Sequence, residues 1–209
     1  MRKTKKKKQK AGKIVIGLTG GIATGKKTAS SVFASIGAFV INADEIYKDL
    51  TEAGSGLNLK IAKEFGRNIL NKDLTLDKKI LAKIVFKDKN KLARLSSITH
   101  PEIIKEIKKR IKAAGAGITV LAAPLLIEAG QTKLVKDIWL ITCSQKRQIE
   151  RVMKRDKVSR AGALLRIRSQ MSLKEKSGFA DVIIENNGTK KDLKRQILQN
   201  LEKRYGFYR

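Results

Sequence analysis

The chain has few residues of several types, and each scarcity narrows its function. Among 209 residues there are one cysteine, one histidine and two prolines, and only 5% are aromatic. The single Cys143 excludes an internal disulfide and suits a reducing cytoplasm, and one cysteine with one histidine argues against a zinc site. The longest apolar stretch, residues 118–127, contains Pro124 and is too short to span a bilayer. We therefore predict a cytoplasmic protein without a membrane segment.

Acidic residues are also scarce, because 19 of them stand against 47 lysines and arginines and leave a net charge of +28. Such a charge favours anionic partners such as nucleotides and nucleic acid. Residues 2–10 carry seven positive side chains and no acid, which predicts a disordered basic tail over residues 1–12. We expect nucleic acid to bind this tail only non-specifically. Elsewhere the excess of lysine over arginine and the scarcity of rings favour a solvated surface.

A glycine-rich segment at residues 17–28 is the most specific pattern in the chain. It follows an apolar run at residues 14–16 and precedes an amphipathic one at residues 29–36. This order of strand, loop and helix is typical of a phosphate-binding loop. The spacing from Gly20 through Gly25 to Lys26 fits the first seven positions of G-x-x-x-x-G-K-[ST]. The candidate nucleotide-binding residues are Gly20, Gly21, Ile22, Ala23, Thr24, Gly25, Lys26, Lys27 and Thr28.

The chemistry expected of this loop is phosphate binding. Glycines let backbone N–H groups approach an anion, and a helix that begins near Lys26 adds its positive N-terminal dipole. Lys26 would reach the β- and γ-phosphates. The eighth position is Lys27, whose ammonium cannot ligate Mg²⁺ as a serine or threonine hydroxyl does. Thr28 has a hydroxyl, but it points about 100° away around the helix. A glycine-rich turn without a ligand is the alternative interpretation.

Apolar runs and helical spacing indicate the fold. Five short apolar runs separated by helical patterns are typical of buried parallel strands in an α/β architecture. They span residues 14–18, 38–41, 118–123, 138–142 and 182–184. Residues 49–112 predict an all-helical insertion, in which Asp77 and Asp88 cap helices, Gly66 ends one and Pro101 begins another. A last helix is predicted to pack on the core through Leu193, Ile197, Leu201 and Tyr205.

Acidic and apolar residues follow two of the predicted strands. Asp44 follows the second strand, where a carboxylate suits a general base for an acceptor hydroxyl or a water-mediated metal ligand. Capping of a helix over residues 45–50 explains Asp44 equally well. Residues 124–128 follow the third strand and would form an apolar wall with Glu128 as a polar anchor, although a strand-to-helix turn explains them too.

A basic helical stretch follows the fourth strand. Arg151 and Arg155 are four residues apart and share a face, and Arg160 comes soon after. Arginine clamps on a triphosphate neutralise developing charge in kinases, and a solvated basic face is the alternative. The one histidine, His100, would lie just before the helix begun by Pro101. A structural role is favoured for it over a minor role in an acceptor pocket.

Eight segments, in this order along the chain, resemble the dephospho-CoA kinase family. The family pattern G-L-T-G-G-I-x-[ST]-G-K-S-T is matched at residues 17–28 except at Lys27, and its I-D-A-D is matched at residues 41–44 except at Asn42. The further matches lie at residues 76–78, 85–88, 100–103, 124–128, 148–156 and 180–188. The resemblance runs from residue 14 to about residue 188, and its specificity lies in the joint order of the segments.

This resemblance implies a P-loop kinase-like three-layer fold over residues 13–209, with a five-stranded parallel sheet. It also implies a helical acceptor-binding insertion at about residues 49–112 and a lid at about residues 145–175. The implied reaction is transfer of the γ-phosphoryl group of ATP to the 3′-hydroxyl of dephospho-CoA, the last step of coenzyme A biosynthesis, with Mg²⁺ as cofactor. The implied catalytic residues are Lys26, Asp44, Arg155 and Arg160. The implied acceptor-binding residues are Asp44, His100, Pro124, Leu125, Leu126 and Glu128.

Two departures from the family pattern concern the cation. Lys27 replaces the serine that ligates Mg²⁺, and Asn42 replaces an aspartate, although its side-chain oxygen still accepts a hydrogen bond. No metal ligand is therefore assigned. Lys27 would contact phosphate and partly stand in for the charge of the metal. The first hypothesis is a working but metal-impaired kinase. The alternatives are a non-catalytic descendant that binds ATP or CoA-like anions, and a basic nucleic-acid-associating protein on a kinase scaffold.

Overall fold

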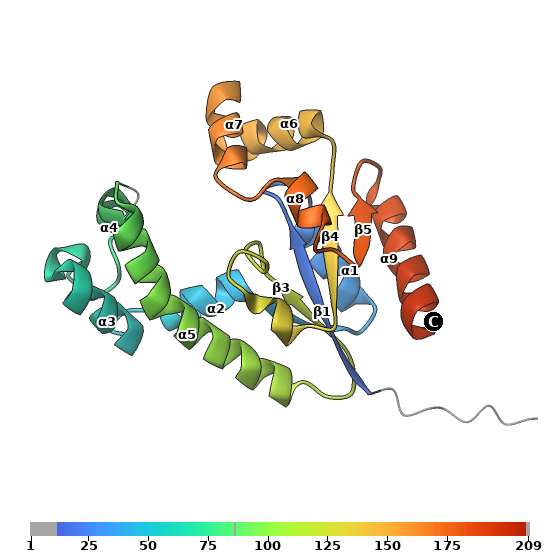
Figure 1. Cartoon of the computed structure of the whole chain (residues 1–209), viewed down its shortest axis with the longest axis horizontal. Helices are drawn as coiled ribbons and strands as arrows, with labels where there is room; N and C mark the ends of the chain where they lie inside the picture. Colours follow the sequence, from blue (N-terminus) through green and yellow to red (C-terminus); the bar gives the residue numbers. More distant parts are fainter. Residues whose placement is uncertain (1–11, 86, 208–209) are drawn as a thin grey trace, which may run out of the picture. The chain divides into compact units, whose positions relative to one another are not determined.

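Figure 1 shows a computed structural model of the chain, which describes residues 12–85 and 87–207. Of the predicted basic tail over residues 1–12, only Gly12 is therefore described. The chain divides into two compact units. The sheet unit comprises the described residues up to Ile41 and from Ala113 onward, and the helical unit is Asn42–Lys112.

The sheet unit is built on five strands in the order β2-β3-β1-β4-β5. The strands are β1 (Lys13–Gly20), β2 (Phe39–Asn42), β3 (Gly117–Ala122), β4 (Asp137–Thr142) and β5 (Val182–Glu185). β1 pairs in parallel with β3 and with β4, and β4 pairs in parallel with β5. All five predicted strands are thus confirmed. Because β1 is central, the loop that follows it emerges at the carboxyl edge of the sheet between two neighbours.

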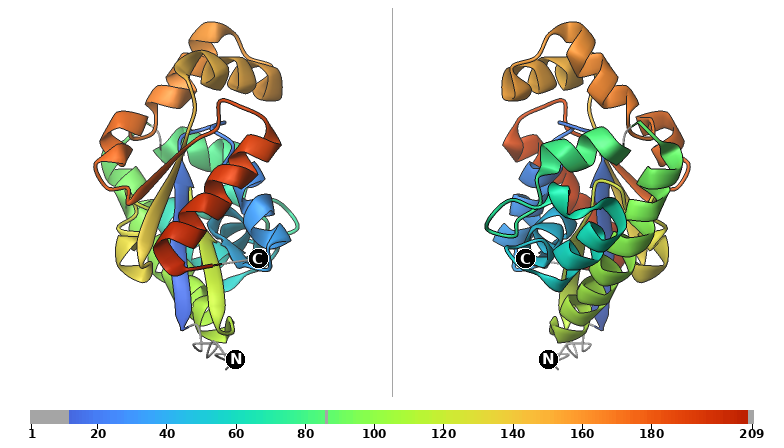
Figure 2. Two further views of the ribbon diagram at one scale, coloured as in Figure 1. Left: turned by 90° about the vertical axis from the view of Figure 1, so that its right-hand side faces the viewer. Right: turned by 90° about the vertical axis from the view of Figure 1, so that its left-hand side faces the viewer.

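Two helices of the sheet unit, α1 (Lys26–Ser35) and α9 (Lys190–Tyr205), cover the same face of the sheet (Figures 1 and 2). The ring of Phe33 from α1 meets the ring of Trp139 from β4 edge-on at 5.4 Å between centroids. The predicted packing of the last helix is confirmed, because three of its apolar residues are fully buried in this core and a fourth packs against it. They are Leu193, Ile197, Leu201 and Tyr205.

Three further helices follow β4: α6 (Gln145–Asp156), α7 (Arg160–Arg168) and α8 (Leu173–Ser177). Figure 1 shows α6 and α7 beyond the carboxyl ends of the strands. Both helices share a small apolar cluster around the buried Val152 and Ala163, and Ile22 and Ala23 of the glycine loop pack against that cluster. The basic helical stretch predicted after the fourth strand therefore lies against the loop. A short 3₁₀ helix, η2 (Gln131–Leu134), precedes β4.

The helical unit has its own apolar core. Its elements are α2 (Ala43–Leu50), α3 (Gly56–Phe65), η1 (Arg67–Ile69), α4 (Lys78–Val85) and α5 (Lys89–Ala113). The core residues are Leu57, Ile61, Ala62, Ile69, Leu76, Leu81 and Val85. Gly66 ends α3 with φ of 96°, where a side chain would be strained. Asp77 and Asp88 accept N–H groups from the first turns of α4 and α5. These three helix boundaries were predicted correctly.

One prediction about this unit is wrong, and one of two open interpretations is excluded. Pro101 does not begin a helix but lies inside α5, which runs unbroken for 25 residues, and His100 is therefore an interior helical residue. α5 buries Thr99 before Pro101 and Ile107 after it, so that packing on both sides outweighs the local preference of proline for a first turn. The cap of α2 is Asn42 rather than Asp44, because the Asn42 Oδ1 accepts the N–H of Asp44 at 3.0 Å.

Over the two described stretches of the chain, the structure contains no helix that is both long and apolar enough to cross a membrane.

Candidate active site

At two positions of the glycine loop between β1 and α1, a side chain would clash with atoms of neighbouring elements. Gly25 precedes α1 with φ of 105°, and a Cβ atom built there would lie 1.9 Å from the Asn186 Nδ2. A Cβ atom at Gly20 would lie 2.6 Å from the Ile141 carbonyl oxygen. These two positions therefore need glycine, since the loop is pressed against β4 and against the segment after β5. α1 begins at Lys26, as predicted, with its N-terminal dipole at the end of the loop.

Donors from other elements bind three consecutive carbonyl oxygens of the loop. The Gln148 Nε2 donates to Ile22 at 2.8 Å, the Asn186 Nδ2 donates to Thr24 at 2.8 Å, and one guanidinium nitrogen of Arg151 reaches both Ala23 and Thr24 at 3.3–3.4 Å. Carbonyls engaged on this outer side leave the amide side of the loop for an anion. The loop is therefore held in its conformation by side chains distant in sequence.

Arg151 thus has a different place from the one predicted. Its spacing from Arg155 favoured a clamp on triphosphate, but its guanidinium holds the loop and also donates to the Asn186 carbonyl at 3.2 Å. Gln148 lies in the basic helical stretch for which a functional role was considered, but its contact with the loop was not predicted, and Asn186 was not predicted as a site residue, although both lie in segments that resemble the family. Their role could not be read from spacing, since it depends on which carbonyls they meet.

Arg155 and Arg160 lie on the two basic helices near the loop. The guanidinium of Arg155 pairs with Asp156 at 2.7 Å, and its side chain is 56% exposed. The hydrogen bond from Arg155, with a second one from Arg166, lowers the pKa of Asp156 to about 2. Arg160 begins α7 and is exposed. The catalytic roles of both predicted lid arginines stay predictions.

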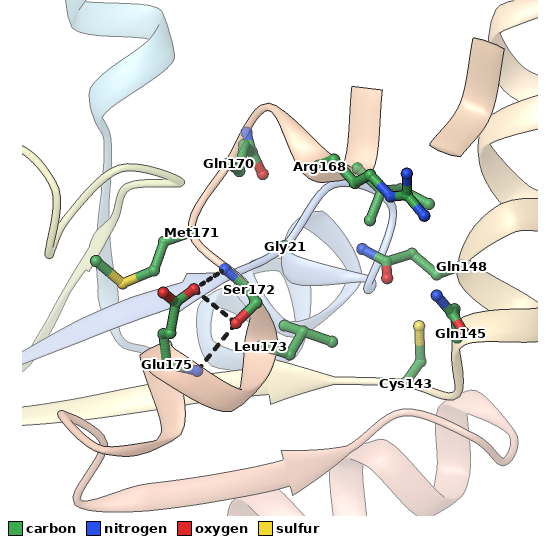
Figure 3. Close-up of a pocket in the computed structure, with 11 residues that line it drawn as sticks. Gly21, Cys143, Gln145, Gln148, Arg168, Gln170, Met171, Ser172, Leu173 and Glu175 are labelled. Carbon is green, nitrogen blue, oxygen red and sulfur yellow. Dashed lines mark hydrogen bonds between the residues drawn. The ribbon is translucent and has the colours of Figure 1, made fainter. Parts of the chain in front are cut away.

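A cavity of 510 Å³ opens beside the glycine loop (Figure 3). Gly21 and Gln148 form one side, and the segment before α8 forms another, with Ser172 and Glu175 locked in a capping box. Its lining residues are Gly21, Cys143, Gln145, Gln148, Ile167, Arg168, Gln170, Met171, Ser172, Leu173 and Glu175. Burial raises the pKa of the Cys143 thiol despite the nearby Arg151 and Arg147, which favours the protonated form.

The predicted acceptor wall at residues 124–128 is only partly available as a surface. Leu125 is 46% exposed. Leu126 is fully buried against Gly17 of β1 and belongs to the core, so its predicted contact with the acceptor is wrong. Glu128 forms an ion pair with the buried Lys176 at 2.8 Å, a partner that sequence analysis missed. The Pro124 carbonyl accepts the hydroxyl of Thr19 at 3.2 Å.

Asp44 and His100 belong to the helical unit. Asp44 is exposed in the first turn of α2, where its negative charge interacts favourably with the positive end of the helix dipole. His100 is half-buried within α5. Their predicted roles as base and acceptor-pocket residue stay predictions.

The residues at the start of α1 do not fit a metal held directly by the glycine loop. Lys27 is exposed, Thr28 is half-buried, and the first turn of α1 has no acidic residue. The hydroxyl of Thr24 is fully buried and donates to the Gly21 carbonyl at 3.0 Å. Among residues 12–85 and 87–207 there is no group of three or more histidine, cysteine, aspartate or glutamate residues that could hold a metal ion. The structure therefore agrees with the sequence that the start of α1 is poorly suited to hold a metal ion directly.

A central strand, a glycine loop and a lysine-initiated helix at the carboxyl edge of a parallel sheet, with basic helices against the loop, define a P-loop kinase. Shikimate kinase from Acinetobacter baumannii shares this fold with a TM-score of 0.54 at 15% identity, over 92% of this chain and 94% of that one. The dephospho-CoA kinase from Campylobacter jejuni is nearer, with a TM-score of 0.67 at 31% identity over 91% of this chain and 96% of that one.

Sequence comparisons narrow the class to one family. A dephospho-CoA kinase of Carboxydothermus hydrogenoformans is 45% identical over 192 residues, which cover 90% of this chain and 93% of the relative. The family model for dephospho-CoA kinase matches residues 14–192. The chain belongs to the dephospho-CoA kinase family. The predicted family, fold and enzyme class are therefore confirmed, and kinases of this family use ATP and typically a divalent metal.

Proposed function

We propose that the protein transfers the γ-phosphoryl group of ATP to the 3′-hydroxyl of dephospho-CoA and so completes coenzyme A. The observation that carries this proposal is the glycine loop, whose carbonyls are bound by Gln148, Arg151 and Asn186 while Lys26 begins the helix behind it. A loop held in this way binds the triphosphate without rearrangement, which favours catalysis by preorganisation. Membership of the family supports the choice of acceptor.

The proposed chemical step needs only a positioned base and stabilised charge. The Asp44 carboxylate takes the proton of the 3′-hydroxyl, the oxygen bonds to the γ-phosphorus, and the bond from that phosphorus to the β–γ bridging oxygen breaks, which releases ADP. Lys26 and the N-terminus of α1 stabilise the phosphate oxygens, and Arg155 and Arg160 close over them. His100, Pro124, Leu125 and Glu128 contribute to the acceptor pocket, while Leu126 supports it from the core.

Mg²⁺ is the divalent metal that we propose for this reaction, as a partner of the ATP phosphates. Because the glycine loop offers no oxygen ligand at position 27, the protein itself contributes little to holding it. The Lys27 ammonium instead contacts a phosphate as a compact point charge. The local exchange of a hydroxyl for an ammonium also favours a second candidate, a catalytically impaired protein that still binds ATP or CoA-like anions.

The deciding experiment measures ADP release from Mg-ATP with and without dephospho-CoA, with the coenzyme A product identified by mass. The wild-type protein is compared with Lys27→Ser and with Lys203→Ser, an exposed-lysine control at the far end of α9. We expect acceptor-dependent turnover in the wild type. No turnover in the wild type with turnover in Lys27→Ser would establish the catalytically impaired candidate. No turnover in either protein would refute the proposed kinase activity.

A second readout concerns the metal alone. Titration of Mn²⁺ against protein bound to a non-hydrolysable ATP analogue, followed by the paramagnetic resonance of free Mn²⁺, reports metal affinity without turnover. We expect tighter binding in Lys27→Ser, because a hydroxyl ligand replaces a repelling ammonium. Equal affinities in the two proteins would contradict the place proposed for Lys27.

The cytoplasm is the compartment we propose, on the strength of the single cysteine. We also propose that nucleic acid binds only non-specifically, through residues 1–12. Removal of these residues is then expected to abolish most salt-sensitive binding to a random RNA. Unchanged binding after truncation would assign it to the folded surface instead.

A further inference from the structure

Lys176 is a lysine without any exposed side-chain surface, at 0%. It lies in α8, and its Nζ donates to the Pro124 carbonyl at 2.7 Å and contacts the two carboxylate oxygens of Glu128 at 2.8 and 3.1 Å. A buried ammonium is costly unless it is paired and hydrogen-bonded. These three contacts supply that pairing, and all of them go to the segment that follows β3.

The Pro124 carbonyl joins Lys176 to the base of the glycine loop. Thr19, fully buried in β1 and next to Gly20, donates its hydroxyl to the same carbonyl at 3.2 Å. One backbone oxygen therefore accepts a charged donor from α8 and a neutral donor from the strand that precedes the loop. Displacement of either donor would move residues 124–128 relative to the loop.

α8 also borders the cavity beside the glycine loop. Leu173 and Glu175 line that cavity together with Gly21 (Figure 3), and Glu175 closes the capping box with Ser172. Lys176, the next residue, turns to the segment after β3 instead. The short helix therefore has one set of residues at the cavity and another at the segment proposed to contact the acceptor.

We propose that Lys176 is a positioning residue for phosphoryl transfer, which sets the place of residues 124–128 against the base of the glycine loop. This inference rests on the proposed function, because the acceptor is what those residues are proposed to contact. Stability alone does not account for the pair, since apolar residues of similar volume are often as stabilising as a buried ion pair. What the ion pair adds is a defined geometry, because its hydrogen bonds are directional.

The test compares Lys176→Met with Lys174→Met, an exposed lysine of the same helix, and with Lys176→Arg as the conservative variant. We expect kcat/KM for dephospho-CoA to fall about ten- to a hundredfold in Lys176→Met, since small displacements of a positioning group have effects of this order. KM for ATP should stay unchanged, Lys176→Arg should restore part of the loss, and Lys174→Met should match the wild type. Wild-type acceptor kinetics in Lys176→Met would overturn the proposal.

Thr19→Val provides a second test if Lys176→Met does not fold. It removes the other donor to the Pro124 carbonyl with little change of volume, and we expect a smaller loss in the same parameter. Hydrogen exchange gives a readout independent of turnover, because the Leu126 and Ala129 N–H groups are hydrogen-bonded within the turn after β3. Faster exchange there in Lys176→Met or Thr19→Val than in Lys174→Met supports the inference even if the wild type fails to turn over. Equal exchange would overturn it.

Discussion

The sheet unit contains charged side chains that are buried in ion pairs, whereas the ion pairs of the helical unit are more exposed. In the sheet unit Lys176 and Glu128 pair with 0% and 23% of their side chains exposed, and Arg204 pairs with Asp137, which is only 9% exposed. In the helical unit the pairs lie on the surface: Lys60 in the pair with Glu102 is 61% exposed, and Arg94 in the pair with Glu64 is 59% exposed. Besides exposed pairs such as that of Arg155 with Asp156, the sheet unit therefore has buried charges beside the turn after β3 and at the start of β4, whereas the pairs of the helical unit stay partly exposed.

The buried side-chain amide of Asn58 makes polar contacts inside the helical unit, away from solvent. Asn58 is fully buried and donates to three backbone carbonyls, those of Thr51, Glu52 and Leu74. It joins the end of α2 to the turn before α4, a function that exposed ion pairs cannot perform because water competes for them. Four substitutions, from the largest expected effect to the smallest, test how each unit uses its polar and charged side chains.

Asn58→Ala should destabilise the helical unit most. Three carbonyls lose their donor inside the fold, which costs about 2–3 kcal/mol at typical values for buried unpaired groups. Hydrogen exchange should show faster exchange of residues 43–112 than of the sheet unit, and Asn90→Ala, an exposed position, should show neither change. Equal loss of protection in both units would mean that they unfold together and would remove the contrast.

Arg151→Ala should weaken ATP binding through the glycine loop. The loss of a charged donor to the Ala23 and Thr24 carbonyls is expected to raise KM for ATP about tenfold, which corresponds to about 1.4 kcal/mol. Lys154→Ala removes an exposed cation from the same helix and should leave KM for ATP unchanged. Equal KM values in the two variants would show that bulk positive charge, and not support of the loop, matters at this place.

Low pH should remove the stability contributed by the ion pair of Asp137 and Arg204, which lies at the start of β4. Burial of Asp137 opposes ionisation, but hydrogen bonds from Arg204 and Tyr205 prevail and lower the pKa of its carboxyl below the ordinary 3.8. A carboxylate with a lowered folded-state pKa stabilises the protein fully above its ordinary pKa and progressively less as pH falls through the folded-state value.

Asp137→Asn is the matched variant for this effect. The difference in unfolding free energy between wild type and Asp137→Asn, measured by urea titration, should be large at pH 6 and shrink below about pH 4. A difference independent of pH over this interval would contradict the assignment of the pair as a charged contact.

Arg110→Gln should have the smallest effect of the four. Arg110 bridges Glu106 and Asp49 on the surface of the helical unit, at 3.0 and 2.7 Å, with Asp49 half exposed. Exposed pairs of this kind contribute at most about 1 kcal/mol, and salt screens them. Urea titrations at low and high salt should show a small loss that disappears at high salt, with Lys108→Gln as the exposed control. A larger, salt-independent loss would place this pair with those of the sheet unit.

Local patterns predicted the parts of the fold that depend on neighbours in sequence. Short apolar runs gave five correct strands, and Gly66, Asp77 and Asp88 marked helix ends correctly because a cap contacts the next residues of its own chain. The prediction that Pro101 begins a helix was wrong because it too relied on a local preference. This preference was outweighed by the burial of Thr99 before it and Ile107 after it, which depends on the packing of the whole unit.

The same difference between local and long-range contacts applies to the candidate site. The glycine loop with Lys26 and the departure at Lys27 could be recognised, because contiguous residues make the pattern. The holders of the loop could not be recognised. Arg151 meets Thr24 across 127 positions and Asn186 meets it across 162. Leu126 failed as a contact surface because only the packing against Gly17 shows which side of the turn is buried.

By its sequence alone, this protein was determined to be an α/β kinase of the dephospho-CoA kinase family, with a phosphate loop at Gly20 to Lys26 and a lysine where the metal ligand is expected. Only the tertiary structure decided that Arg151 supports the loop and that Lys176 is buried against Glu128, 48 positions away. The physical reason is the range of the interactions. Periodicity and capping act over a few residues, whereas burial and the pairing of a charge depend on what the fold brings near it.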